Sequence, residues 1–242
     1  MAEPNTSHSI TPDTVEMSDD EKYLFDLLGF VIVRDVLSAA HLELANAAID
    51  AMELRQNPEY FGDSVALKGE NKSTRLGNTE GLLELEKPYC EPFREMLAHP
   101  PTTPHLNTIL GEGWRLDHGP GLIAMDKGCS GGMLHGNFDN APYFYREGRI
   151  FTGLCGVEYL LADEGPGAGG IAVVPGSHKA NVECPSAMRR WEQHQEYVTE
   201  VNASAGDAVI FSEACTHGTL PWTADHQRRA LLYKSVSYTH LT

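Results

Sequence analysis

Two histidines in this chain stand in settings that suit a metal site. His135 lies in the segment LHGNFD and His217 in CTHGTLPW, and a glycine follows each of them at the expected end of a strand. If the two strands are neighbours, both imidazoles can point into one cavity. An Fe(II) ion held by two histidines and one carboxylate keeps its other positions open for substrate, oxygen or a chelating acid. We therefore treat His135 and His217 as candidate iron ligands.

A pair of arginines follows the second histidine. Arg228 and Arg229 begin the segment RRALLYK, which reads as a buried strand. Side chains alternate between the two faces of a strand, so only one of these arginines can face the cavity. A guanidinium binds a carboxylate through two parallel hydrogen bonds and stays charged in an enclosed site. We expect Arg228 to hold the far carboxylate of a keto-acid cosubstrate.

The histidine pair must be weighed against the 11 histidines of the chain. Histidine is a common metal ligand and equally a common buried hydrogen-bond donor, so a pair alone carries little information. Five others lie in polar or proline-flanked stretches and are predicted to be solvated, namely His8, His99, His105, His194 and His226.

The elements that must position these residues begin with two helices. Leu24, Leu27 and Leu28 recur at helical spacing before Gly29, and the FVIV segment that follows predicts a short buried strand. Ser38 can cap the second helix. Residues 57–79 are polar and aperiodic and are predicted to form a long loop.

Strand candidates fill the rest of the chain. They are WRLDH, GLIAMD, RIFTGLCGVEYLLAD, GIAVVP, YVTEV, DAVIFS and RRALLYK. Many short strands after helices predict an all-β core with flanking N-terminal helices, arranged as a jelly roll.

Composition indicates one domain and limits the partners. The 242 residues are 41% hydrophobic and can bury one sizeable core. The formal charge of −16, with no cluster of lysine and arginine, argues against nucleic acid as a partner. The 5 cysteines show no C-x-x-C pair, which favours reduced thiols over a zinc cage or disulfides. Neither a signal peptide nor a membrane span is predicted, so we expect an intracellular, cytoplasmic protein.

Four segments of the chain resemble the phytanoyl-CoA dioxygenase family of Fe(II)- and 2-oxoglutarate-dependent oxygenases. They are YLFDLLGFVIVRDVLSAAHLELANAAID, GPGAGGIAVVPGSHK, AGDAVIFSEACTHGTLPW and RRALLYK. The resemblance extends over residues 20–234 and implies a double-stranded β-helix of the cupin type. It further implies that His135 and His217 bind Fe(II), and that Arg228 and the hydroxyl of Thr219 bind 2-oxoglutarate.

The chain departs from the family at the carboxylate ligand. The family places this ligand two residues after its first histidine, where this chain has Asn137. Asp139 could reach the metal if the chain bends, Asn137 could bind through its amide oxygen, or water or a halide could fill the position. We favour Asp139, because the Gly and Asn residues around it tolerate turn conformations.

The resemblance implies hydroxylation of an unactivated C–H bond in a small-molecule or acyl-thioester substrate, with release of succinate and CO2. Three alternatives stand beside it. They are a halogenating variant with a halide in place of the carboxylate, a non-catalytic jelly-roll binding module that has lost productive iron binding, and a cupin-type metal enzyme without the keto acid, against which Arg228 argues.

The domain prediction has three parts. Residues 1–18 are expected to be a disordered polar arm and residues 19–234 a single oxygenase-like domain. Residues 235–242 do not continue the family pattern and could be a non-native tail, so a C-terminal targeting signal stays open.

Overall fold

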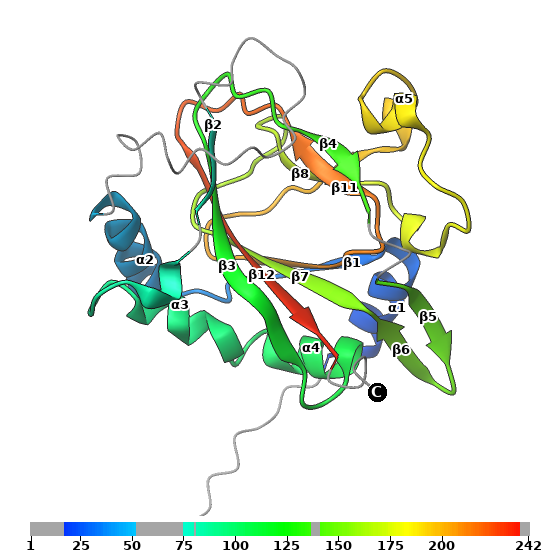
Figure 1. The fold of residues 1–242 in the computed structure, drawn as a ribbon, viewed down its shortest axis with the longest axis horizontal. Helices are drawn as coiled ribbons and strands as arrows, with labels where there is room; N and C mark the ends of the chain where they lie inside the picture. Colours follow the sequence, from blue (N-terminus) through cyan, green and yellow to red (C-terminus); the bar gives the residue numbers. More distant parts are fainter. Residues whose placement is uncertain (1–16, 52–74, 80, 137–140, 238–242) are drawn as a thin grey trace, which may run out of the picture.

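The structure is a computed structural model that describes residues 17–51, 75–79, 81–136 and 141–237 (Figure 1). Within them the chain is mostly β, with two antiparallel sheets, a separate two-stranded hairpin and a small number of helices. None of the helices in these ranges is long and apolar enough to cross a membrane.

The larger sheet has six strands in the order β1-β10-β7-β12-β3-β2, and each strand runs antiparallel to its neighbours. The strands are β1 (Phe30–Val33), β2 (Arg75–Thr79), β3 (Arg115–Met125), β7 (Leu154–Leu160), β10 (Ala208–Ser212) and β12 (Arg228–Val236). β12 lies inside the sheet, between β7 and β3. Residues at its start are therefore enclosed by strands on both sides.

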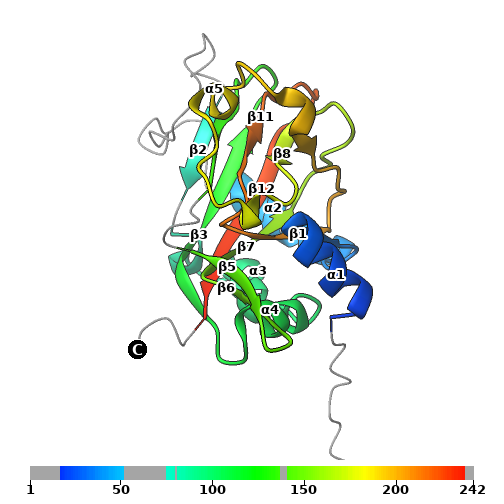
Figure 2. The ribbon, with the colours of Figure 1, turned by 90° about the vertical axis from the view of Figure 1, so that its right-hand side faces the viewer.

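The smaller sheet has the order β4-β11-β8-β9 and lies beside the larger one (Figures 1 and 2). Its strands are β4 (Gly132–His135), β8 (Gly170–Val173), β9 (Thr199–Glu200) and β11 (His217–Leu220). A buried apolar cluster joins the sheets, with Ile171 and Val173 of β8 packed among Leu160, Phe211 and Ala230 of the larger sheet. The hairpin of β5 (Tyr143–Arg146) and β6 (Arg149–Thr152) stands apart from both.

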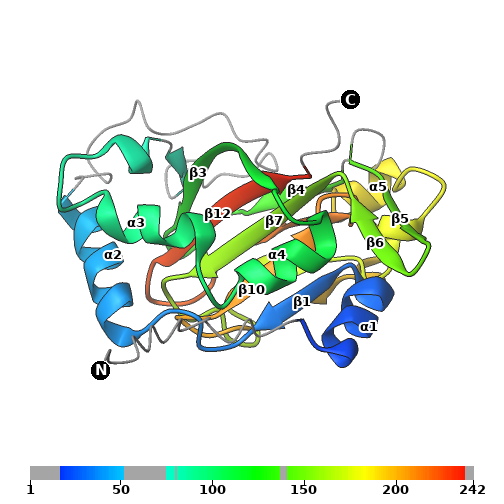
Figure 3. The same cartoon turned by 90° about the horizontal axis from the view of Figure 1, so that it is seen from below.

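Helices cover the other face of the larger sheet (Figure 3). They include α2 (Ala39–Ala51), α3 (Glu91–Glu95) and α4 (Thr103–Leu110), while α1 (Asp19–Leu28) precedes β1 and the short α5 (Ser186–Arg189) lies near β4. Single 3-10 turns occur at Leu82–Glu84, Met96–Ala98, Ser177–Lys179 and Gln195–Tyr197. Apolar side chains of α2, α3 and α4 pack with Val157, Leu231 and Tyr233 in a second core. The larger sheet is thus buried on both faces.

Local signals at the first two helices are confirmed. Ser18 and Glu21 form a reciprocal capping box at the start of α1, and Gly29 ends that helix with φ of 87°. The backbone N–H of His41 donates to the Ser38 hydroxyl at 3.2 Å, as expected of a capping residue before α2. The strand predicted in FVIV is β1.

Several strand boundaries differ from the prediction. WRLDH and GLIAMD form one continuous strand, β3, whereas RIFTGLCGVEYLLAD is divided at Gly153 into β6 and β7. A Cβ at Gly153 would lie 2.5 Å from the Cα of Ala141, so the chain needs a glycine at this crossing. Part of the expected loop is also a strand, because Arg75–Thr79 pairs with β3 as β2. β12 runs to Val236, two residues into the segment set apart as a tail, and the proposed domain bounds stay a prediction.

Gly156 provides a test of packing between neighbouring strands of the larger sheet. A Cβ at this position of β7 would lie 2.4 Å from the ring of Phe211 in β10. Gly156→Ala should therefore lower the free energy of unfolding by about 1–3 kcal/mol, the usual effect of overpacking a core. Urea unfolding measures this change. Gly119→Ala on β3, where a Cβ meets open space, is the matched control and should have little effect. Equal losses in the two variants would show that the packing described for Gly156 is wrong.

Candidate metal centre and buried arginine

The two candidate iron ligands lie directly opposite each other. His217 of β11 pairs in register with His135 of β4, and their ring centroids are 4.3 Å apart. His217 is buried and His135 is exposed. The structure therefore brings together the two histidines that the sequence singled out, with one imidazole inside the protein and the other open to solvent.

Hydrogen bonds orient both imidazoles in the same way. The Nδ1 atom of His217 lies 2.7 Å from the carbonyl oxygen of Cys215, and Nδ1 of His135 lies 3.2 Å from that of Met133. A carbonyl only accepts, so each Nδ1 carries the proton and each Nε2 presents a lone pair. Burial lowers the pKa of His217 to about 4, which keeps this imidazole neutral. Neutral imidazoles held through Nδ1 are the form in which histidine binds metals.

A buried carboxylate, which the sequence analysis did not identify, lies beside these imidazoles. Glu213 follows β10, is 3% exposed, and places its Oε2 atom 3.9 Å from Nε2 of His217. Its Oε1 atom pairs with Nζ of Lys234 at 3.1 Å. Burial alone would raise the pKa of Glu213, but the nearby positive charge of Lys234 contributes to a net lowering of this pKa. The signal in the sequence was an acidic residue directly after the apolar strand DAVIFS.

The structure describes only some of the other residues that were predicted to bind the metal or the cosubstrate. Asn137 and Asp139 lie outside the described residues, so both assignments stay predictions. Thr219 is half-buried and is two residues from His217 on β11, which places it on the same face of that strand. Within the described parts of the chain, no three His, Cys, Asp or Glu side chains already converge closely enough to hold a metal ion.

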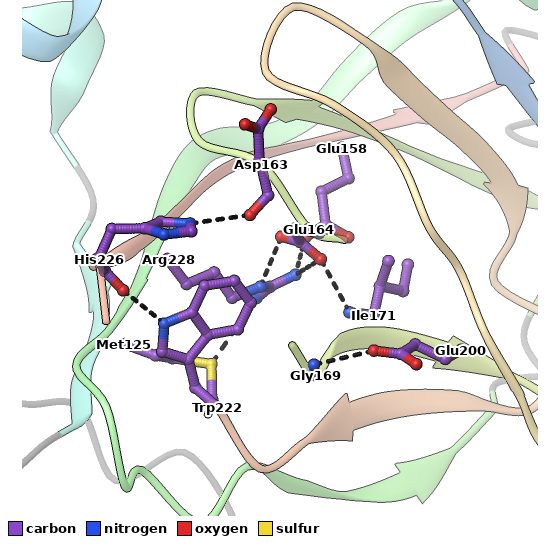
Figure 4. Close-up of polar contacts among 10 residues, drawn as sticks. All are labelled: Met125, Glu158, Asp163, Glu164, Gly169, Ile171, Glu200, Trp222, His226 and Arg228. Carbon is purple, nitrogen blue, oxygen red and sulfur yellow. Dashed lines mark hydrogen bonds and ion pairs between the residues drawn. The ribbon is translucent and has the colours of Figure 1, made fainter. Parts of the chain in front are cut away.

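Arg228 lies in a buried group of charges between the sheets (Figure 4). Its guanidinium is 1% exposed and donates to Glu164 through Nε at 2.6 Å and through Nη2 at 3.3 Å. Nη2 also donates to Glu158. Within the described part of the chain, the remaining nitrogen, Nη1, has the sulfur of Met125 as its acceptor at 3.9 Å, and sulfur is a weak acceptor. Among the described residues, Nη1 is therefore the guanidinium nitrogen without an oxygen acceptor.

The two glutamates reach Arg228 from different elements. Glu158 is on β7, and Glu164, in the loop after β7, also accepts from the backbone N–H of Ile171 at 3.2 Å. A Cβ at Gly170, which has φ of 93°, would lie 2.0 Å from Oε2 of Glu164, so this glycine leaves room for the carboxylate. Burial raises the pKa of Glu158 to about 7. A neutral Glu158 leaves one positive and one negative charge in the group.

Arg229 confirms the predicted alternation along β12. Its guanidinium points to the helical side, where it donates to Asp50 at 2.5 Å and to the side-chain oxygen of Asn46 at 2.9 Å, both on α2. Of the two arginines, Arg228 is the one that faces the space between the sheets. Cosubstrate binding by Arg228 stays a prediction.

Of the histidines expected at the surface, His105 is in fact buried and His99 is half-buried. His105 is 5% exposed and its Nε2 lies 3.1 Å from a carboxylate oxygen of Glu21. His99 is half-buried, with Nε2 2.6 Å from the carbonyl oxygen of Val36. The prediction was wrong because it was made from polar neighbours in the sequence, whereas the burial comes from packing of the helical layer. His194 and His226 are exposed as expected.

Comparisons with known proteins place the fold. The sequence model of phytanoyl-CoA dioxygenase (PhyH) matches residues 25–230. HygX from Streptomyces hygroscopicus, in a structure with nickel and 2-oxoglutarate bound, superposes with a TM-score of 0.72 at 16% identity, over 92% of this chain and 88% of HygX. AviO1 from Streptomyces viridochromogenes Tue57 superposes with a TM-score of 0.66 at 19% identity, over 90% of this chain and 93% of AviO1. The alpha ketoglutarate dependent carbocyclase SnoK from nogalamycin biosynthesis superposes with a TM-score of 0.67 at 17% identity, over 91% of this chain and 84% of SnoK. Among curated proteins, none matches this chain in sequence.

Removal of Glu164 tests the buried charge group. Glu164→Ala should lower the free energy of unfolding by about 3–5 kcal/mol, because it leaves the charge of Arg228 without its two-point partner. The change can be measured by urea unfolding at neutral pH. Asp225→Ala, which removes the exposed partner of Lys127, is the control and should be nearly neutral. If both variants unfold at the same urea concentration, Glu164 does not stabilise Arg228 as described.

Proposed function

Since this chain belongs to the phytanoyl-CoA dioxygenase family, we propose that it is an Fe(II)- and 2-oxoglutarate-dependent oxygenase. The proposed reaction is hydroxylation of an unactivated C–H bond in a small-molecule or acyl-thioester substrate, with release of succinate and CO2. The observation that carries the proposal is the cross-strand pair of His135 and His217, with both Nε2 atoms available to a metal. The two sheets are proposed to form the double-stranded β-helix, or jelly roll, of this family.

Different residues of the chain are proposed to bind the metal and the keto acid. His135 and His217 would hold Fe(II), and Asp139 stays the predicted carboxylate from the sequence. When bound, Fe(II) and 2-oxoglutarate supply the oxidising chemistry through oxidative decarboxylation of the keto acid. His217 is enclosed, while the exposed side of His135 leaves an approach for oxygen and substrate.

The keto acid is proposed to bind through its far carboxylate. The proposed donors are Nη1 of Arg228, which among the residues described by the structure contacts a sulfur, and the hydroxyl of Thr219. The carboxylates already on Arg228 limit this binding, because a third negative charge in a buried group is unfavourable. Protonation of Glu158 removes one of these charges. Keto-acid binding is then coupled to proton uptake by Glu158.

A non-catalytic binding module is the second candidate. The observation that favours it is that Glu158 and Glu164 already neutralise Arg228 without any ligand. In such a protein the two sheets would serve as a scaffold. Arg228 would stay paired with the two glutamates and would not bind a keto acid. An intracellular location and the absence of a nucleic-acid partner stay predictions under either function.

The proposed function predicts that metal and keto acid bind together. Anaerobic Fe(II) and 2-oxoglutarate should give the visible charge-transfer band of a chelated keto acid, and admission of oxygen should then yield succinate. His217→Ala, which removes the buried ligand, should abolish the band. The assay is run with and without chloride, since a chlorinated product would identify the halogenating variant. A wild-type protein with no band at saturating iron would favour the binding module.

Binding of the keto acid is also predicted to depend on pH. The charged groups that face Glu158 are Arg228 of β12 and Glu164 of the loop after β7. Burial raises the pKa of Glu158 above its ordinary value, so the proton is bound below about pH 7 and lost above it. The affinity for 2-oxoglutarate should therefore fall as pH rises through 7, by roughly tenfold between pH 6 and pH 8.

The matched variant is Glu158→Gln, which keeps the size of the side chain and a hydrogen-bond acceptor for Nη2. Its affinity for 2-oxoglutarate should be nearly independent of pH over the same range and should equal or exceed that of the wild type at pH 8. Titration of the charge-transfer band or calorimetry measures it. A variant with the same pH dependence as the wild type would show that a different group titrates.

A further inference from the structure

We infer that the outer face of the β5–β6 hairpin is a docking surface for an anionic lipid membrane. The hairpin follows β4, precedes β7 and pairs with neither of the two larger sheets. It lies beside α1 and α4 at the edge of the molecule, and its turn points away from both sheets (Figures 1 and 3). The inference does not depend on the proposed function, because it concerns a surface outside the candidate metal centre.

The inner face of the hairpin is fixed to the body of the protein. Thr152 is buried, and its hydroxyl lies 2.7 Å from the hydroxyl of Ser212 on β10. Tyr143, opposite Thr152 in the hairpin, donates its phenolic hydrogen to Asp26 of α1 at 2.6 Å. Ile150 on the same face is also buried. Since this face packs inward, the other face of the two strands is left to point outward.

The outer face carries two aromatic rings and two arginines. Phe144 of β5 pairs in register with Phe151 of β6, and Arg146 pairs with Arg149. Residues two apart on a strand share a face, and so do residues directly opposite each other on antiparallel strands. The phenylalanine rings are stacked with their centroids 4.9 Å apart, yet Phe144 is 44% and Phe151 39% exposed. The rings therefore pack on each other and still offer a flat apolar surface.

The two arginines are placed unfavourably in the free protein. Like charges directly opposite each other on paired strands repel. Arg146 has a partner in Glu147 at 3.4 Å, but both side chains are largely exposed, and Arg149 has no ion-pair partner among the described residues. A phosphate group between the two guanidinium groups would offset the repulsion and accept hydrogen bonds from both. The charge of this face is thus complementary to the phosphates of lipid headgroups.

The turn of the hairpin holds this face in shape. Glu147 and Gly148 form a two-residue loop in which both residues have positive φ, 53° and 79°. This combination matches the natural twist of antiparallel strands. A face that is already ordered loses little conformational freedom on binding.

The size of the face favours a membrane over a protein partner. A stable protein interface buries about 800 Å² on each partner. β5 and β6 have 4 residues each, so each strand spans about 13 Å and lies about 5 Å from the other. This footprint is too small for a stable complex with another protein or a second copy of the chain. Membrane binding has no such threshold, because exposed apolar area and basic charge each add to it.

The net charge of −16 does not prevent this docking. Interactions between exposed charges are largely screened beyond about 8 Å at physiological ionic strength. The arginines at the contact therefore determine the attraction, while acidic groups elsewhere on the molecule act only through screened distances. The same reasoning predicts that binding weakens as salt is raised from about 0.1 M to about 1 M.

Sedimentation of the intact protein with lipid vesicles tests the inference. Vesicles of equimolar phosphatidylcholine and phosphatidylserine should bind the wild type, and vesicles of phosphatidylcholine alone should bind it about tenfold more weakly or less. Arg146→Gln combined with Arg149→Gln should weaken binding to the anionic vesicles by about tenfold or more, because each base near the surface contributes about fivefold. This variant removes a repulsion, so it should fold as the wild type does.

A matched control changes the net charge equally at another place. Lys87→Gln combined with Arg115→Gln alters two exposed bases outside the hairpin. Its binding to the anionic vesicles should stay within about twofold of the wild type. Circular dichroism establishes that both double variants are folded.

The aromatic rings are tested in the same assay. Phe144→Ala combined with Phe151→Ala should weaken binding to the anionic vesicles by about tenfold or more, because it removes the apolar contact with the lipid. Val182→Ala combined with Tyr197→Ala, at residues 77% and 62% exposed, is the control and should bind as the wild type does.

A fluorescent reporter measures contact with the lipid directly. Phe151→Trp places an indole ring in the outer face, and its emission should shift to shorter wavelength when anionic vesicles are added to a folded protein. The difference is taken against the wild type, which has 3 tryptophans of its own. An unchanged spectrum would show that this face does not enter the membrane.

Three further results would overturn the inference. The first is a wild-type protein that does not bind the anionic vesicles, or binds both kinds of vesicle equally. The second is an arginine variant that binds as tightly as the Lys87 and Arg115 control. The third is a wild-type dimer that becomes a monomer in the Phe144 and Phe151 variant, measured by sedimentation equilibrium, which would make the face an interface between two copies.

Discussion

The antiparallel pairing of β4 with β11 is the interaction on which the candidate site depends. It places His135 opposite His217 and leaves so little room between the strands that a Cβ at Gly218 would lie 2.8 Å from the carbonyl oxygen of Met133. The two imidazoles converge only because the strands approach this closely. Their Nδ1 atoms are each bound to a carbonyl oxygen two residues earlier, so the same local backbone that forms the strands also orients the rings.

The larger sheet contributes the charges around this pair. Arg228 and Lys234 lie on the inner face of β12, and each is neutralised by carboxylates from neighbouring elements. Lys234 binds Glu213 at the histidine end, and Arg228 binds Glu158 and Glu164 at the other end of the strand. Buried charges are tolerated only when they are paired and hydrogen-bonded. Both groups of charges therefore contain a positive residue of β12. Removal of Arg228 or Lys234 would leave uncompensated carboxylates between the sheets.

Local sequence signals were sufficient to predict the first two helices and insufficient to predict the elements that follow them. The capping residues Ser18 and Ser38, together with Gly29, mark the helix ends because their hydrogen bonds involve residues a few positions away. The short helices α3 and α4 were missed, and β2 lies in a segment read as a loop. The two helices pack on the larger sheet and β2 pairs with β3. Both are long-range effects that no short window of sequence contains. The burial of His105 follows from the same packing.

The sequence by itself determined the residue types that could bind a metal, and the alternation along a strand assigned Arg228 and Arg229 to opposite faces. Those results need only side-chain chemistry and the period of a β-strand. The tertiary structure alone decided which carboxylates accompany them. Glu158, Glu164 and Glu213 meet their partners across strands or loops, and an isolated glutamate in a sequence carries no sign of the base it will pair with. Partner choice depends on the register of distant strands, which is fixed only when the two sheets fold together.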